Sequence, residues 1–260
     1  MISYFKELNQ YRELLFTFAS RNLKVRYKQT VMGVGWAILQ PITLMVIFTI
    51  VFSRFARVPS EDIPYPIFSY CALLPWTLFS SSVNTGVASI TGNMNLVTKI
   101  YFPREVLPFA SIMASFVDFL IASIIFVGMM IYYKINLSIY MFWIPLFILI
   151  QIIFTMGFIL AASAANVFFR DVRHVMPLLI QIWMYLTPVI YPLNLVPEKI
   201  RFYYMLNPMA VIIESYRNVI LKNTAPDYKF LALSFIVSIV LFFAGYSYFK
   251  KSEKVFADII

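Results

Sequence analysis

The chain has 260 residues, of which 61% are hydrophobic, 18% aromatic and only 13% charged, and its formal net charge is +9. Soluble domains are about one quarter charged and disordered chains need low hydrophobicity, so this composition excludes both classes. The single cysteine, Cys71, excludes an intrachain disulfide and a cysteine-rich metal site. The sequence therefore predicts an integral membrane protein.

The first predicted element is an amphipathic interface helix over residues 1–30. Its apolar side chains recur at alternating spacings of four and three residues, and its basic residues lie on other faces. The apolar face consists of Tyr4, Leu8, Tyr11, Leu15 and Phe18. Such a helix lies in the inner headgroup layer or packs on a cytoplasmic partner, and both arrangements can hold at once. The segment lacks the uninterrupted apolar core of a cleaved signal peptide.

Six runs of low charge follow, and each is long enough to cross the membrane once. About 20 apolar residues span the hydrocarbon layer. The predicted spans lie near 31–53, 67–90, 106–133, 140–168, 175–195 and 230–249. Thirteen of the 21 lysines and arginines fall on the side that contains both termini. The positive-inside rule then predicts an all-α integral membrane fold with six transmembrane helices and both termini in the cytoplasm.

Residues 1–260 are expected to form a single transmembrane domain, and the 91–105 loop stands out between its second and third spans. The loop is too polar to cross, yet Leu96, Val97, Ile100 and Tyr101 form one face of a short helix that Pro103 stops. On the cytoplasmic side, such a helix suits a docking partner. The alternative is a helix that lies passively at the membrane interface.

The 196–229 segment is the second unusual connection. Pro197, Pro208 and Pro226 separate stretches rich in Tyr, Phe and Met. This pattern predicts short re-entrant or surface helices on the outer side, between spans five and six. Irregular backbone at membrane depth persists only where protein or water satisfies it, so such a segment usually borders a pathway.

Asp118 is the only charge in the run between Glu105 and Lys134. An ionised carboxylate at the centre of a span costs about 2.5–3.5 kcal/mol. Asp118 must therefore face the bundle, find donors such as Ser115 one turn away on the same helix, or be protonated. It either contacts a coupling ion or substrate, or it accepts an interhelical hydrogen bond.

Aromatic side chains gather near the span ends and beside prolines. They form either the interfacial belts of any membrane protein or a lining on which sugar rings stack. The residues concerned are Trp36, Tyr70, Trp76, Phe79, Trp183, Tyr185 and Tyr191.

Several chemistries are excluded by the absence of their motifs. The chain has no Gly-Lys dipeptide and thus no P-loop, and it has no G-x-S-x-G elbow. His174 is the only histidine, so a multi-histidine metal site is excluded. Charge is not interleaved with exposed aromatics as in a nucleic-acid site. The sequence therefore predicts neither an enzyme nor a nucleic-acid-binding protein.

Five stretches resemble the ABC-2 type permeases, and among them the membrane subunits of bacterial polysaccharide exporters for O-antigen, teichoic acid and capsule. They occur in the family's order and spacing between about residues 12 and 220. The stretches are Arg21-Asn-Leu-Lys-Val-Arg-Tyr-Lys28 with Gly33, Trp36 and Pro41; Phe102-Pro-Arg-Glu-Val-Leu-Pro108; Asn166-Val-Phe-Phe-Arg-Asp-Val-Arg-His174; Tyr185-Leu-Thr-Pro-Val-Ile-Tyr-Pro192; and Leu206-Asn-Pro208.

The resemblance implies a multi-pass subunit of the bacterial inner membrane that works as a homodimer with two copies of a separate P-loop ATPase. ATP and Mg²⁺ would bind to that partner, and this chain would hold no cofactor or metal. The cargo would be a polyprenyl-pyrophosphate-linked polysaccharide, an O-antigen-like glycan of lipopolysaccharide biosynthesis, moved outward among membrane lipids.

The resemblance also implies roles for particular residues. The ATPase-coupling residues would be Leu96, Val97, Ile100, Tyr101, Phe102, Arg104, Glu105, Arg170, Asp171 and Arg173. The substrate conduit would be lined by Trp36, Trp76, Phe79, Trp183, Tyr185 and Tyr191. The pyrophosphate would be attracted by Arg21, Lys24, Arg26 and Lys28.

Three alternatives remain open at this stage. One is an ABC-2 exporter of a drug, heme or another lipid-like substrate. Another is a secondary carrier or channel that depends on Asp118 and needs no ATPase. The third is a membrane scaffold that transports nothing.

Overall fold

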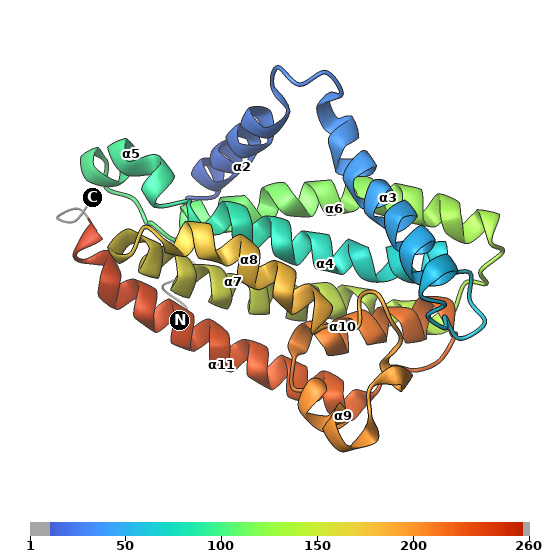
Figure 1. Cartoon of the computed structure of the whole chain (residues 1–260). Helices are drawn as coiled ribbons and strands as arrows, with labels where there is room; N and C mark the ends of the chain where they lie inside the picture. Colours follow the sequence, from blue (N-terminus) through green and yellow to red (C-terminus); the bar gives the residue numbers. More distant parts are fainter. Residues whose placement is uncertain (1–10, 257–260) are drawn as a thin grey trace.

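The computed structural model describes residues 11–256, and within this range every regular element is a helix (Figure 1). The predicted all-α fold is thus confirmed for the described part of the chain. The predicted N-terminal helix is present as α2 (Arg12–Tyr27), in which Phe18 is buried. Tyr4 and Leu8 of the predicted apolar face lie outside the described residues.

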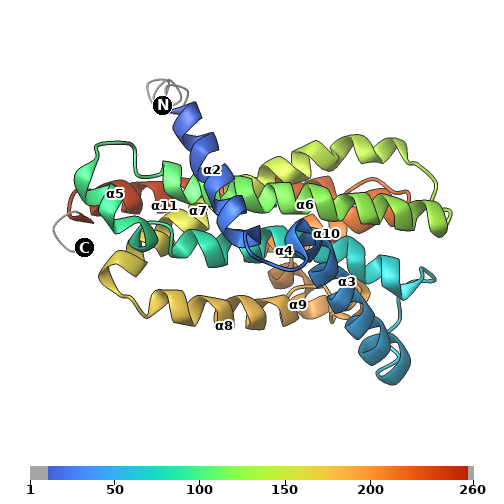
Figure 2. The same ribbon diagram turned by 90° about the horizontal axis from the view of Figure 1, so that it is seen from above.

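Four long helices lie side by side and form the body of the molecule (Figures 1 and 2). They are α4 (Tyr65–Val87), α6 (Val106–Tyr132), α7 (Ile144–Phe168) and α11 (Tyr228–Glu253). A fifth long helix, α3 (Trp36–Phe48), continues as a π-helical segment (Thr49–Phe55) and packs obliquely against α4 and α6. Helix α2 packs on α6 on the same side, so α2 and α3 together cover one face of the body.

The remaining helices are short and lie at the two ends or beside the body. They are α5 (Met94–Lys99), α8 (Val172–Tyr185), α9 (Glu198–Tyr204) and α10 (Pro208–Tyr216), the last continued by a π turn (Arg217–Leu221). Single 3-10 turns lie at Gly33–Gly35, Thr91–Asn93, Ile139–Trp143 and Leu193–Leu195. The prediction of short helices in the 196–229 segment is therefore confirmed, whereas its place on the outer side stays a prediction.

Four helical stretches are long and apolar enough to cross a membrane, and they coincide with four of the six predicted spans. They are Gly33–Phe55, Val106–Tyr132, Ile139–Phe168 and Tyr228–Glu253. Helix α4 has 23 residues, about 35 Å at 1.5 Å per residue, but polar side chains in its second half lower its hydropathy. The six-span count therefore stays a prediction.

The helix expected over 175–195 is wrong in its second half, because α8 ends at Tyr185. Pro188 and Pro192 lack the N–H groups that a continuing helix needs. The carbonyl oxygens of Pro188, Val189 and Tyr191 instead accept hydrogen bonds from the guanidinium of the fully buried Arg217. A side chain 26 residues or more away along the chain thus satisfies this non-helical backbone.

The closest helix contact joins α7 to α11 through two glycines. A Cβ atom on Gly157 would lie 2.6 Å from the backbone of Phe242, and one on Gly245 would overlap the carbonyl of Gly157. The two backbones therefore approach as only glycine permits, which is how small residues pack membrane helices. This contact fixes the side of the body opposite α3.

Candidate functional site

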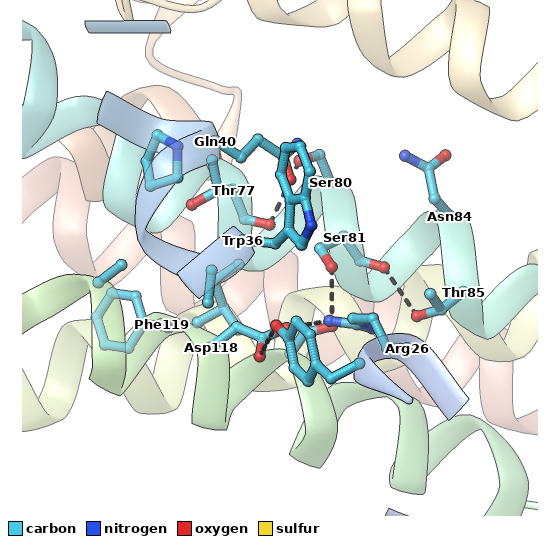
Figure 3. A pocket seen from close by; sticks show the side chains of 16 residues that line it. Arg26, Trp36, Gln40, Thr77, Ser80, Ser81, Asn84, Thr85, Asp118 and Phe119 are labelled. Atoms are coloured by element: carbon cyan, nitrogen blue, oxygen red, sulfur yellow. Dashed lines mark hydrogen bonds and ion pairs between the residues drawn. The ribbon is translucent and has the colours of Figure 1, made fainter. Parts of the chain in front are cut away.

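A polar cavity of about 420 Å³ lies between α2, α3, α4 and α6 (Figure 3). Its size falls in the range of roughly 300–1,000 Å³ that is usual for ligand pockets. The lining residues are Arg26, Tyr27, Trp36, Ala37, Gln40, Pro41, Thr77, Leu78, Ser80, Ser81, Asn84, Thr85, Ser115, Asp118, Phe119 and Ala122.

Helix α4 contributes the polar wall of this cavity. Residues three, four and seven apart share one helix face, and on α4 this face carries Thr77, Ser80, Ser81, Asn84 and Thr85. The hydroxyls of Thr77, Ser80 and Thr85 donate to α4 carbonyls three or four residues earlier at 2.8–3.3 Å. Because these hydroxyls already donate to the backbone of α4, they have less capacity to bind a ligand. Asn84 has no such partner within residues 11–256.

Helix α3 contributes the opposite wall. Trp36 and Gln40 are one turn apart, so their side chains project from the same face of α3 over the cavity (Figure 3). The Trp36 side chain is 48% exposed. Neither its indole N–H nor the Gln40 amide has a hydrogen-bond partner in the described part of the chain.

The charged end of the cavity is an ion pair between α2 and α6. Arg26 contacts the Asp118 carboxylate, and the Tyr27 hydroxyl donates to the other carboxylate oxygen at 2.6 Å. Burial, together with the Asp118 carboxylate, holds the pKa of Tyr27 well above its usual range, so the phenol remains a donor. Of the two readings of Asp118, the structure shows an interhelical hydrogen-bonding role, although with Arg26 and Tyr27 in place of a Ser115 donor.

A second cavity of about 630 Å³ adjoins the first, and Arg26 and Thr85 line both. Arg21 also lines it, donates to the Asn93 side chain and lies 4.8 Å from the centre of the Phe18 ring. Among the four predicted pyrophosphate-attracting residues, Arg21 and Arg26 therefore already have partners. Lys24 and Lys28 are exposed, and their side chains have no polar partner within residues 11–256.

The predicted conduit aromatics fall into three places. Trp36 lines the cavity, whereas Trp76 and Phe79 are buried in the body at 3% and 0% exposure. Phe79 packs edge-on against Trp183, with ring centres 5.3 Å apart. In this conformation, Trp76 and Phe79 support neighbouring helices and do not face open space.

Tyr185 and Tyr191 lie at the start and end of the loop that follows α8. The Tyr191 hydroxyl donates to the Tyr185 carbonyl at 2.9 Å and also contacts the Tyr204 hydroxyl. Tyr185 itself is 50% exposed. Arg217 organises this loop through its hydrogen bonds to the loop carbonyls. The sequence did not predict this contact, because Arg217 lies far from the loop along the chain.

The 91–105 loop and α2 form one surface at the end of the body where α4, α7 and α11 terminate. The rings of Phe18 and Phe102 pack with centres 6.0 Å apart. Beside them, a groove of about 440 Å³ runs between α2 and the loop. The predicted short helix is present but ends at Lys99, so Ile100 and Tyr101 follow it as extended, exposed residues at 57% and 95% exposure. Leu96 is half-buried and Val97 is buried.

Arg104 and Glu105 attach this loop to the end of α11. The Arg104 guanidinium donates to the Glu253 carbonyl, and Glu105 is buried against Lys250 at 2.8 Å. Lys250 also pairs with the Glu253 carboxylate at 2.9 Å. Sequence reasoning did not find Lys250 and Glu253, because nearly 150 residues separate them from the loop.

The 170–174 loop lies at the same end, and the buried Asn166 joins it to α4. The Asn166 amide donates to the carbonyl of Val87 and the hydroxyl of Thr91, while its oxygen accepts from the Arg173 N–H at 3.1 Å. Arg170, Asp171 and Arg173 themselves are exposed. The predicted coupling residues therefore lie together at one end of the molecule. Three of them, Val97, Phe102 and Glu105, are buried.

Comparison with known proteins gives a consistent result over nearly the whole chain. The ABC-2 type transporter family matches residues 13–221. The O-antigen export system permease protein RfbA of Myxococcus xanthus is 33% identical over 263 residues, which is 100% of both chains. RfbA of Klebsiella pneumoniae is 32% identical over 95% of both. The polysialic acid transport protein KpsM of Escherichia coli is 24% identical over 90% of this chain and 91% of its own.

Proposed function

Because this chain belongs to the ABC-2 type transporter family, we propose that it is the transmembrane subunit of an ATP-driven exporter of a lipid-linked polysaccharide. The observation that carries this proposal is the similarity to O-antigen export permeases, which extends from end to end of both chains. The cargo would move from the cytoplasm to the outer side of the bacterial inner membrane. ATP and Mg²⁺ would act on a separate ATPase chain.

The topology that fits this role has six spans with both termini in the cytoplasm. Helix α4 supplies the second span, and its polar face is tolerable because it borders a cavity instead of lipid. Helix α8 has only 14 residues, about 21 Å, and supplies the fifth span together with the loop that Arg217 organises. The 196–229 segment then closes the outer side.

The ATPase-docking surface in this proposal combines α2, the 91–105 loop and the 170–174 loop. Ile100 and Tyr101 are exposed apolar side chains beside a groove, as a docking contact requires. When the ATPase moves the loop, Arg104 and Glu105 would transmit this movement to α11 through their contacts with Glu253 and Lys250. Asn166 would pass it to the base of α4.

The cargo path in this proposal follows α3, α4 and α8 between two copies of the chain. Helix α3 has an apolar outer face that a second copy or lipid must cover. Lys24 and Lys28, whose ammonium groups have no partner among residues 11–256, would attract a pyrophosphate at the cytoplasmic side. The glycan would follow through the adjoining polar cavities, where Trp36 is the accessible aromatic.

The test is affinity purification of the chain from native membranes in mild detergent, with mass spectrometry of the co-eluting material. We expect a P-loop ATPase in equal amount and a polyprenyl-linked glycan. If the ATPase co-elutes with a drug-like or other lipid substrate, that substrate and not a polysaccharide is the cargo. Elution of the chain alone, with transport indifferent to nucleotide, would reject the ATP-driven proposal and make Asp118 the first residue to substitute.

A further inference from the structure

The cavity between α3 and α4 combines an aromatic surface with a hydrogen-bonding surface. Trp36 presents a half-exposed indole face on one wall. Gln40 beside it and Asn84 across from it present carboxamides, each with two donors and one acceptor oxygen. Hydroxyls of α4 surround them, as Figure 3 shows.

The two amides are in an unusual state for a membrane protein. Both side chains are exposed on predicted spans, and within residues 11–256 neither makes a hydrogen bond. An amide left unpaired against hydrocarbon is costly, since nothing there can accept or donate. Gln40 and Asn84 must therefore face water, a polar cargo or a polar surface of a second copy.

A sugar ring matches this arrangement group by group. Its C–H face stacks on an aromatic face, and its hydroxyl edge donates to and accepts from amides. The hydroxyls of Thr77, Ser80 and Thr85 are already bonded to their own helix. The Ser81 hydroxyl contacts the Ser115 hydroxyl of α6, so the α4 hydroxyls offer weak secondary contacts. The two amides have no hydrogen-bond partner within residues 11–256. They are therefore the groups that can distinguish one sugar from another.

The charge of the cavity selects among sugars. Among residues 11–256, the charged residues that line it are Arg26 and Asp118, and they form an ion pair with each other. The cavity is thus close to electrically neutral. An acidic sugar would bring a carboxylate near Asp118, where the neighbouring cation, Arg26, is already paired, and the two like charges would repel each other.

We propose that this cavity is a subsite for neutral sugar rings, in which Trp36 is the stacking face and Gln40 and Asn84 bind the ring hydroxyls. The inference rests on the proposed export of a lipid-linked glycan. It adds that the exported repeat is built of neutral sugars and not of uronic or sialic acids.

The test replaces the chromosomal gene in the native organism and measures both surface glycan and lipid-linked glycan retained inside, per amount of this protein in the membrane. A deletion strain shows the cargo itself, because its retained glycan can be hydrolysed and its sugars identified. The test variants are Gln40→Leu with Asn84→Leu, and Gln40→Glu with Asn84→Asp, which keep the size of the side chains and add charge. Asn136→Leu removes an exposed amide from the loop after α6 and serves as the control.

We expect both double variants to lower export about fivefold or more, while Asn136→Leu exports normally. The leucines remove the hydrogen bonds of both amides, whereas the carboxylates remove the N–H donors and add negative charge to the cavity. The retained glycan of the deletion strain should contain neutral sugars. Native export by the double variants would reject the subsite, and acidic sugars in the retained glycan would reject its selectivity. Loss of a dimer in size-exclusion chromatography would assign the amides to a contact between copies. A deletion strain that retains no glycan would reject the proposed function itself.

Discussion

Asp118 lies near the middle of α6, and two consecutive side chains of α2 bind its carboxylate. The pair connects the interfacial helix to the depth of the membrane body, beside the polar cavity. Arg26 keeps 24% and Asp118 keeps 16% of its side chain exposed, so water reaches both. The residue therefore anchors α2, whatever further part it plays in transport.

Removing either partner of this pair should have unequal effects. Arg26→Met leaves a carboxylate without its cation and should lower the stability of the protein by about 1–3 kcal/mol, below the full cost for a buried pair because both groups are partly exposed. Asp118→Asn should cost less, since the long Arg26 side chain can turn toward water. Thermal unfolding in detergent measures both, and the double variant should recover stability relative to Arg26→Met. Equal losses for the two single variants would contradict this account.

At the scale of elements, the contact between α7 and α11 depends on two glycines. Gly157→Leu has no room against the backbone of Phe242 and should separate the helices, lowering stability by about 2 kcal/mol or more. Gly128→Leu is the matched control, because a Cβ atom at Gly128 meets nothing within 4 Å. Both variants are compared by thermal unfolding in the same detergent. A control that unfolds as early as Gly157→Leu would show that helix packing is not the cause.

The attachment of the 91–105 loop to α11 can be tested by reversing the charge of Arg104. Arg104→Glu places a carboxylate against the end of α11 and beside Glu253, so the loop should detach from that helix. We expect export to fall severalfold while the ATPase continues to turn over, which reconstituted vesicles containing the partner would measure. Lys134→Glu, at the other end of the body, is the charge-reversal control. Unchanged export with Arg104→Glu would remove Arg104 from the coupling pathway.

In the molecule as a whole the two ends differ in charge, and the proposed orientation rests on this difference. Lysines and arginines concentrate at the end that holds α5, the 170–174 loop and the last turn of α11. The positive-inside rule places that end in the cytoplasm. In the proposed topology the polar cavity opens in the cytoplasmic half of the body, where the cargo would enter.

Cysteine labelling tests this orientation directly. Cys71 is buried, so the native chain should react little with a membrane-impermeant maleimide. Tyr101→Cys, at a site 95% exposed, should react in inside-out vesicles, and Leu137→Cys, at a site 85% exposed, should react in intact spheroplasts. The opposite pattern would invert the topology. Labelling of both positions from one side would contradict an odd number of crossings between them.

The amino-acid sequence alone is sufficient to predict the membrane class, the all-helical fold, four of the spans and the short helix in the 91–105 loop. These features depend on local composition and periodicity, which neighbouring residues in the chain carry. The sequence also predicted that Asp118 faces the bundle, because an isolated charge in a span must find a partner. Family motifs pointed to an ABC-2 permease, which the comparisons confirmed.

Contacts between side chains that are far apart in the chain become visible in the folded molecule alone. Arg26 with Asp118, Arg217 with the loop after α8, and Lys250 with Glu105 are pairs that no local pattern predicts. The same is true of the polar cavity. Gln40 and Asn84 do not stand out in the sequence of their own helices, and the packing of α3 on α4 brings them to one cavity. Helix packing sets these neighbours, and the free energy that fixes it is distributed over the whole body of the molecule.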